Sequence, residues 1–287
     1  MEVRTDTVNG VRLAYAVHPG TGTPIVLVHG VGSSLDNWGD VPKDLAAGGR
    51  TVIALDLLGH GQSGAGNGDF SLGSHACAIR DLLDHLAIER VHLVGHSLGG
   101  GVSMQFNYQF PQRVESLTLI SSGGLGTEVG ARLRAASLPG SEIVLRTVTS
   151  KPVLRTMTWL SRALGTVGHA PGILSPRAIA KLERLQDAES LTAFLATVRS
   201  VVGPQGQRVS ALERLEHLDA DRVLIIWGDA DPMLPVQHGH DARDLMPGSR
   251  LVIVPGALHD PHTDDPALVT AELLAHVEAV ESRLSPA

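Results

Sequence analysis

The fold is decided by the stretch VHLVGHSLGGG at residues 91–101. Its first four residues form an apolar run that is typical of a buried strand. The letters GHSLG at 95–99 match the pattern Gly-x-Ser-x-Gly, a sharp turn from a strand into a helix, and an amphipathic segment at 98–110 follows. The sequence therefore predicts a strand, a strained turn with an exposed Ser97 hydroxyl, and a helix whose positive dipole end lies near that hydroxyl.

Two glycines of this turn have a steric role. Gly95 and Gly99 lack a Cβ atom, so the strand and the helix can approach each other closely around Ser97. A glycine-rich loop that merely holds a serine hydroxyl would carry the same letters. The partners that the rest of the chain offers to Ser97 therefore decide between the two interpretations.

Length and composition limit the class of protein. The 287 residues suit one large α/β domain or a core with an inserted subdomain, and 43% of them are hydrophobic. The formal net charge of −7, without a basic run, argues against nucleic acid as a partner. No stretch has the ~18–20 apolar residues of a membrane span, and the first residues lack the apolar core of a secretory leader. We expect no membrane partner.

The single cysteine, Cys77, cannot form an internal disulfide, which agrees with a reducing cytoplasm as the location. Its helical surroundings with apolar neighbours predict a buried core residue. Metal-ligand spacing such as His-Glu-x-x-His is absent, so we expect neither a metal nor a cofactor. A small-molecule substrate is the expected partner, and the sequence leaves the oligomeric state open.

The segments around the turn alternate between strands and helices. Asn9-Gly10 predicts a type I′ hairpin, and apolar runs such as 24–28 are typical of strands that are buried on both faces. The alternation predicts an α/β fold with a mostly parallel, eight-stranded sheet and helices on both faces. The expected strands are 3–8, 11–17, 24–28, 51–55, 91–94, 114–120, 222–227 and 250–254, and the expected helices of this core are 38–47, 74–87, 98–110, 237–246 and 266–283.

The alternation stops after residue 122. The segment 123–209 holds helical patterns and no convincing strand, and Pro-Gly and Gly-Pro pairs interrupt it. We expect an inserted helical cap over 123–209 and an α/β core formed by 1–122 and 210–287. The helices expected in the cap are 141–149, 153–164, 176–185 and 190–202.

A serine hydroxyl is a weak nucleophile at neutral pH, so it needs a general base, and the base needs an orienting carboxylate. In open parallel sheets, functional groups collect beyond the carboxyl ends of the strands. Asp229 and Asp231 follow the seventh predicted strand, and His259 and His262 follow the eighth. The chain order of serine, aspartate and histidine matches that of the α/β hydrolases.

The chain resembles serine hydrolases of the α/β-hydrolase fold, in the esterase and C–C-bond hydrolase group, over nearly its full length. The resemblance implies a helical cap on the α/β-hydrolase fold. It rests on five motifs that stand in the family's order, namely HGVG at 29–32, DLLGHGQS at 56–63, GHSLGG at 95–100, GDAD at 228–231 and PGALH at 255–259.

The resemblance implies roles for the candidate residues. It selects Asp231 as the acid, because the acid of similar sequences follows strand-Gly-x-x, and leaves Asp229 to cap the turn. It selects His259 as the base through the pattern Pro-Gly-x-x-His. His262 is then expected at the surface beside Asp264.

Backbone N–H groups would hold the negative oxygen that forms during the reaction. The residue after the serine, Leu98, supplies one of them, and the resemblance points to Val31 for the second. Gly30 and Gly32 would let the loop that carries Val31 turn inward.

Six further side chains are candidates for the substrate pocket. An aromatic or methionine side chain at helical spacing belongs to a core more often than to a pocket. His29 is expected to hold the oxyanion loop through hydrogen bonds, and His96 to be structural or pocket-lining. The six candidates are His29, Trp38, His96, Met157, Trp159 and Phe194.

The expected activity is hydrolysis of a carboxylic ester, or a related acyl bond, of a small apolar substrate through an acyl enzyme. Haloalkane dehalogenases and epoxide hydrolases resemble this chain less, because they carry an aspartate where Ser97 stands. The SGG turn at 122–124 is similar to that of C–C-bond hydrolases of ring-cleavage products, which are the alternative. A catalytically silent ligand-binding protein on this fold is an alternative of another class.

Overall fold

A computed structural model describes residues 2–66, 68–165 and 176–284. Eight strands form one sheet in the order β1-β2-β4-β3-β5-β6-β9-β10. The pairs β1–β2 and β2–β4 are antiparallel and the other neighbours are parallel, as the alternation of segments predicts. The strands are β1 (Arg4–Val8), β2 (Val11–His18), β3 (Thr21–Val28), β4 (Arg50–Leu55), β5 (Val91–His96), β6 (Val114–Ile120), β9 (Val223–Gly228) and β10 (Arg250–Val254).

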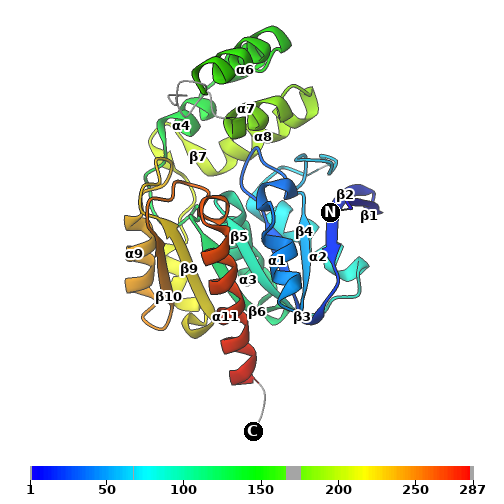
Figure 1. The fold of residues 1–287 in the computed structure, drawn as a ribbon, viewed down its shortest axis with the longest axis vertical. Coiled ribbons are helices and arrows are strands. Elements are labelled where there is room, and N and C mark those ends of the chain that lie inside the picture. The colour runs from blue at the N-terminus through cyan, green and yellow to red at the C-terminus, as the bar shows by residue number, and fades with distance from the viewer. Residues whose placement is uncertain (1, 67, 166–175, 285–287) are drawn as a thin grey trace.

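Helices cover both faces of the sheet (Figure 1). Alternate side chains of β3 show the two layers, because Val26 packs into one hydrophobic cluster and Leu27 into the other. The first cluster includes side chains of α2 (Leu72–His85), α3 (Leu98–Gln109) and α9 (Gln237–Leu245), and the second includes side chains of α1 (Val41–Ala47) and α11 (Pro266–Leu284). None of the helices in the described part of the chain combines the length and the apolar character that spanning a bilayer requires.

Three predictions about the core need correction. The helix expected at 38–47 is a 3-10 turn, η1 (Leu35–Trp38), followed by α1, because Gly39 takes a φ of 55° and separates the two. Cys77 is half-buried rather than part of the core. The short helix α10 (Pro261–Asp264) has no counterpart in the prediction, and neither do the 3-10 turns η2 (Pro111–Arg113), η4 (Leu212–His217) and η5 (Ala220–Arg222).

Helices dominate the region where a cap is expected, and they stand together beyond one edge of the sheet (Figure 1). The last of them touches the loops after β3 and β4, because the side chains of Phe194 and Ala193 lie against Gly32 and Gly59. The extent of a cap over 123–209 stays a prediction. The helices are α4 (Ala131–Ser137), which the sequence did not predict, α5 (Ser141–Val148), α6 (Lys151–Gly165), α7 (Pro176–Arg184) and α8 (Ala188–Val201).

The region also contains a short hairpin, so the expectation of no strand there is wrong. Strands β7 (Val202–Gly203) and β8 (Gly206–Gln207) are two residues long each, too short to produce a periodic pattern. The Gln207 side chain accepts a hydrogen bond from the Gly124 N–H at 2.7 Å, and the Gly124 carbonyl accepts one from the Ala211 N–H at 2.7 Å. The two chain segments that connect the helices to the sheet are therefore hydrogen-bonded to each other.

Candidate active site

Ser97 lies in the turn between β5 and α3, in the strained conformation that the motif predicts. Its φ of 54° and ψ of −116° fall where residues with a Cβ atom are rare, at a cost on the order of 1–3 kcal/mol. A Cβ on Gly95 would lie 2.3 Å from the Gly99 carbonyl oxygen, and one on Gly99 would lie 2.2 Å from the Val28 carbonyl oxygen. The glycines therefore allow the close approach of strand and helix that holds the turn.

We expect Gly99→Ala to lower the free energy of unfolding by more than about 3 kcal/mol or to prevent folding, because the new methyl group meets backbone that cannot move aside. Gly101→Ala in the same helix is the matched control. Its Cβ would make ordinary contacts of 3.6 Å with Leu72, so alanine should stabilise the helix by about 0.5–1 kcal/mol. Urea unfolding measures both changes, and equal stability of the two variants would contradict this account of the turn.

The structure brings Ser97, His259 and Asp231 together in one hydrogen-bonded chain. The Ser97 Oγ and the His259 Nε2 are 2.9 Å apart, and the His259 Nδ1 and an Asp231 carboxylate oxygen are 2.8 Å apart. The carboxylate only accepts, so Nδ1 carries the proton and Nε2 accepts from the Ser97 hydroxyl. The Asp231 side chain is fully buried, and its other oxygen accepts from the backbone N–H groups of Met233 and Leu234.

The competing aspartate and histidine lie outside this chain of hydrogen bonds. Asp229 is exposed and accepts a hydrogen bond from the Gly256 N–H at 2.7 Å, as a turn cap does. His262 is fully buried, so its expected place at the surface beside Asp264 is wrong. The short helix α10 turns its ring inward against Trp38, with the ring centroids 4.6 Å apart.

The two residues predicted to supply the oxyanion donors lie at the cavity next to Ser97. Val31 and Leu98 line the same cavity as Ser97, and neither of their N–H groups donates a hydrogen bond to another described residue. Gly32 takes a φ of 66°, and a Cβ on Gly30 would lie 3.1 Å from the Ser97 Cβ. The loop after β3 therefore reaches the serine only because these two residues are glycines.

His29 holds this loop from beneath and does not face the cavity. Its buried ring donates from Nδ1 to the Gly30 carbonyl at 2.7 Å and accepts at Nε2 from the Leu57 N–H at 3.1 Å. Burial lowers the pKa of His29 well below its ordinary value, which keeps the ring neutral. Burial likewise raises the pKa of Asp56 to about 6, and this carboxyl group accepts backbone N–H groups of Leu35 and Gln62. These contacts fix the two loops beside Ser97.

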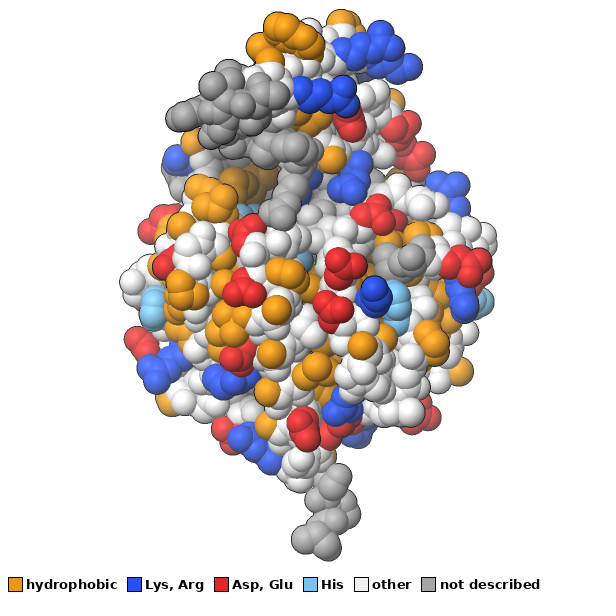
Figure 2. Space-filling view, viewed as in Figure 1, with side chains coloured by type: hydrophobic (Ala, Val, Ile, Leu, Met, Phe, Trp, Pro, Cys, Tyr) orange, Lys and Arg blue, Asp and Glu red, His pale blue; other side chains and the backbone are white. Residues whose placement is uncertain are grey.

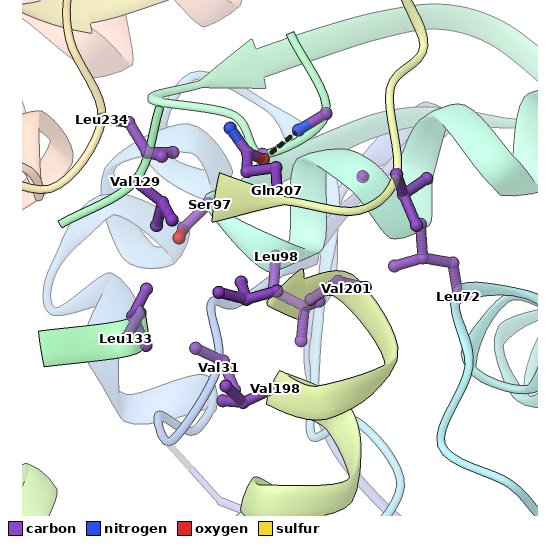
Figure 3. A pocket seen from close by; sticks show the side chains of 15 residues that line it. Val31, Leu72, Ser97, Leu98, Val129, Leu133, Val198, Val201, Gln207 and Leu234 are labelled. Atoms are coloured by element: carbon purple, nitrogen blue, oxygen red, sulfur yellow. Dashed lines mark hydrogen bonds between the residues drawn. The ribbon is translucent and has the colours of Figure 1, made fainter. Parts of the chain in front are cut away.

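The cavity next to Ser97 is small and apolar. Its volume is about 50 Å³, and Figure 3 shows the Ser97 hydroxyl pointing among hydrophobic side chains. None of the lining residues is charged, and Gln207 of the short hairpin is the one amide side chain among them. The lining residues are Val31, Leu72, Ser97, Leu98, Gly101, Gly123, Gly124, Val129, Leu133, Val198, Val201, Val202, Gln207, Val209 and Leu234.

None of the six predicted pocket residues lines this cavity. Trp38 is buried in the core against α1, and Phe194 packs against Gly32. Trp159 on α6 is 67% exposed, and hydrophobic side chains are visible over this helix at the top of Figure 2. Met157 lies half-buried on the same helix. Among the lining residues that the sequence analysis did not identify, Leu133 lies on α4, and Val202 and Gln207 lie on the short hairpin, two elements that carry no recognisable pattern.

His96 is buried beneath the catalytic-histidine candidate and supports its backbone. Its Nε2 donates to the His259 carbonyl at 2.8 Å, and the two rings lie 5.0 Å apart. Burial lowers the pKa of His96 to about 4, so the ring is neutral. The sequence interpretation of His96 as structural fits this position, and its interpretation as a pocket-lining residue does not.

The sheet is mostly parallel, helices cover both of its faces, and a serine occupies a strained turn from a strand into a helix. These features define a class of α/β proteins whose functional loops lie at the carboxyl ends of the strands. The sequence pattern of the alpha/beta hydrolase fold matches residues 23–266. The chain belongs to this family.

Relatives in the family differ in how much is known of them. An uncharacterised protein of Mycobacterium tuberculosis is 44% identical over 91% of this chain and 76% of its own length. The 2-hydroxy-6-oxo-6-phenylhexa-2,4-dienoate hydrolase of Burkholderia cepacia is 26% identical over 84% of this chain and 82% of its own. The crystal structure of an esterase from a Rhodococcus species is similar with a TM-score of 0.70 and 25% identity, covering 98% of this chain and all of the esterase.

Proposed function

We propose that this protein is a serine hydrolase that cleaves carboxylic esters of small apolar acids. The observation that carries the proposal is the hydrogen-bonded chain from Ser97 through His259 to the buried Asp231. It begins at the floor of an apolar cavity, beside two backbone N–H groups without partners among the described residues. Each part has a separate role in acyl transfer.

The reaction follows from the proton positions. The Ser97 oxygen attacks the ester carbonyl carbon while the His259 Nε2 takes its proton. The N–H groups of Val31 and Leu98 hold the negative oxygen of the tetrahedral intermediate, and Asp231 stabilises the charged imidazole. His259 then gives the proton to the departing alcohol and activates a water molecule that releases the acid from Ser97.

The size of the cavity supports a short acyl group. Its volume is about 50 Å³, and one water molecule needs about 10–15 Å³ on the same measure, so the cavity holds about four water-sized groups. The uncharged lining favours a hydrocarbon chain. A dienoate from aromatic ring cleavage carries a carboxylate, whose burial there without a cation would be costly. This contrast favours esters over the C–C-bond substrates of the Burkholderia relative.

A panel of p-nitrophenyl esters tests the proposal. We expect kcat/KM to be highest for the butyrate and to fall about tenfold by the octanoate, because longer chains exceed the cavity. Leu133→Ala removes a side chain from the cavity wall and should move the optimum to the hexanoate. The panel includes 2-hydroxy-6-oxo-6-phenylhexa-2,4-dienoate as a ring-cleavage substrate.

The other outcomes are distinct. Faster turnover of the dienoate than of every ester would replace the proposal with C–C-bond hydrolysis. A protein that turns over no member of the panel, yet binds the esters without releasing p-nitrophenol, would be a ligand-binding protein on this fold.

A further inference from the structure

A partly buried polar cluster lies next to the candidate base. Asp260 is the residue after His259. Its carboxylate forms an ion pair with the Lys181 ammonium group on α7, with Nζ and Oδ2 3.0 Å apart. The His96 Nε2 is 3.6 Å from the same carboxylate, and Asn37 bridges it to His262 with contacts of 3.3 and 2.9 Å. Lys181 is the one member of the cluster that belongs to the helices beyond the sheet edge.

The cluster is balanced by an internal cation. One ring nitrogen each of His96 and His262 and one Asp260 carboxylate oxygen lie within 4.8 Å of one another. Lys181 supplies the positive charge at that point. Burial alone would raise the pKa of Asp260, but the Lys181 cation, and His96 and His262 in the acidic range where their rings carry a proton, more than offset it and lower that pKa well below its ordinary value. Asp260 is therefore an anion beside His259.

We propose that Lys181 is a positioning residue for the reaction. Its ammonium group neutralises the Asp260 carboxylate and so determines the net charge beside the His259 ring. The inference rests on the proposed function, in which His259 must be neutral to accept the Ser97 proton. An unbalanced anion beside His259 would favour its protonated form, which cannot act as the base.

The charged groups around His259 allow us to predict in which direction each substitution shifts the pH at which this histidine takes up a proton. The charged and titratable groups that face it or Asp260 within the described residues are Asp231 after β9, His96 at the end of β5, His262 on α10, and Lys181 on α7. Ser97 is its hydrogen-bond partner. Of these charges, only those of Lys181 and Asp260 can be removed without breaking a contact of the Ser97–His259–Asp231 chain.

Two substitutions should therefore shift the protonation of His259 in opposite directions. Lys181→Met leaves the anion of Asp260 unbalanced, so His259 should take up its proton at a pH about 0.5–1 unit higher. Asp260→Asn leaves the Lys181 cation unbalanced, so the midpoint should fall by a similar amount. The double variant restores neutrality and should return near the wild-type midpoint. Loss of helix docking alone would instead move both single variants in the same direction.

Arg184→Met is the matched control. Arg184 lies on the same helix as Lys181 and faces Asp36 at 3.7 Å, an exposed partner that is not beside His259. This substitution removes one cation between α7 and the core, so it tests for general effects of charge or docking. Its His259 midpoint should stay within about 0.2 units of wild type.

The measurement is a pH titration of histidine Cε1–H signals by NMR in protein carrying 13C-labelled histidine, with the His259 signal assigned from His259→Gln. Because it needs no substrate, it tests the inference even if the protein hydrolyses no ester, and the ester panel tests the function separately. If hydrolysis is found, the acidic limb of kcat/KM should move with the same signs. Shifts of equal sign, no shift at His259, or a shift confined to His96 would overturn the inference.

Discussion

Replacing Ser97 with alanine is expected to lower kcat for p-nitrophenyl butyrate by about 10⁴- to 10⁶-fold, because the attacking oxygen is removed while the cavity and the N–H donors remain. The melting temperature should stay near that of wild type, since alanine and serine meet the same backbone conformation at this position. Ser103→Ala is the matched control. Ser103 is a buried serine on α3 whose hydroxyl has no partner among the described residues, and its loss should leave the rate within about threefold.

A fluorophosphonate probe adds a test that does not depend on the choice of ester. We expect one covalent adduct on the wild-type protein and on Ser103→Ala, located at Ser97 by peptide mass spectrometry, and none on Ser97→Ala. Residual turnover near the wild-type rate in Ser97→Ala would remove the nucleophile assignment. Labelling of both serine variants to the same extent would do so as well.

Asp231→Asn is expected to lower kcat by about 10³- to 10⁴-fold, and Asp229→Asn by less than about threefold. The Asp231 carboxylate has one oxygen on two backbone N–H groups and the other on the His259 ring. An asparagine that keeps its carbonyl oxygen on the backbone must turn its NH₂ group toward the His259 Nδ1. The ring proton then moves to Nε2, which can no longer accept from Ser97.

The comparison of the two variants is informative because both carry the same chemical change two residues apart. The Asp229 side chain accepts a hydrogen bond from the Gly256 N–H in the exposed turn, so its variant controls for the loss of one negative charge near the site. Steady-state rates at saturating butyrate give the ranking. The reverse ranking would move the role of the acid to Asp229.

The sequence predicted the sheet and the Ser97–His259–Asp231 chain because both depend on local patterns and on one geometric rule. The carboxyl ends of parallel strands meet at one edge, so residues just after β5, β9 and β10 had to be neighbours. The turn at Ser97 was also predictable, since Gly95 and Gly99 are required by contacts with nearby backbone.

The pocket and the polar cluster could not be predicted in this way. Gln207 lies on a strand of two residues, which no periodicity reveals. Lys181 meets Asp260 across 79 residues of chain, and that contact depends on how the helices dock, on which the hydrophobic pattern of α7 carries no information. The prediction placed His262 wrongly because Pro261 begins a short helix that turns the histidine ring inward. No sequence pattern indicates this change of chain direction.

The hydrogen bonds between Gly124, Gln207 and Ala211 have a consequence for the redesign of this protein. They join the two connecting segments through which the helical region leaves and rejoins the sheet. Its helices also contact the core directly, where Phe194 and Ala193 meet Gly32 and Gly59 and where Lys181 meets Asp260. Insertions and replacements are tolerated where few contacts cross a boundary. A foreign helical segment grafted between these two connections therefore has to fit their spacing and also replace the contacts at Gly32, Gly59 and Asp260. A library of such grafts would vary what enters the cavity while the loops around Ser97 keep their sequence.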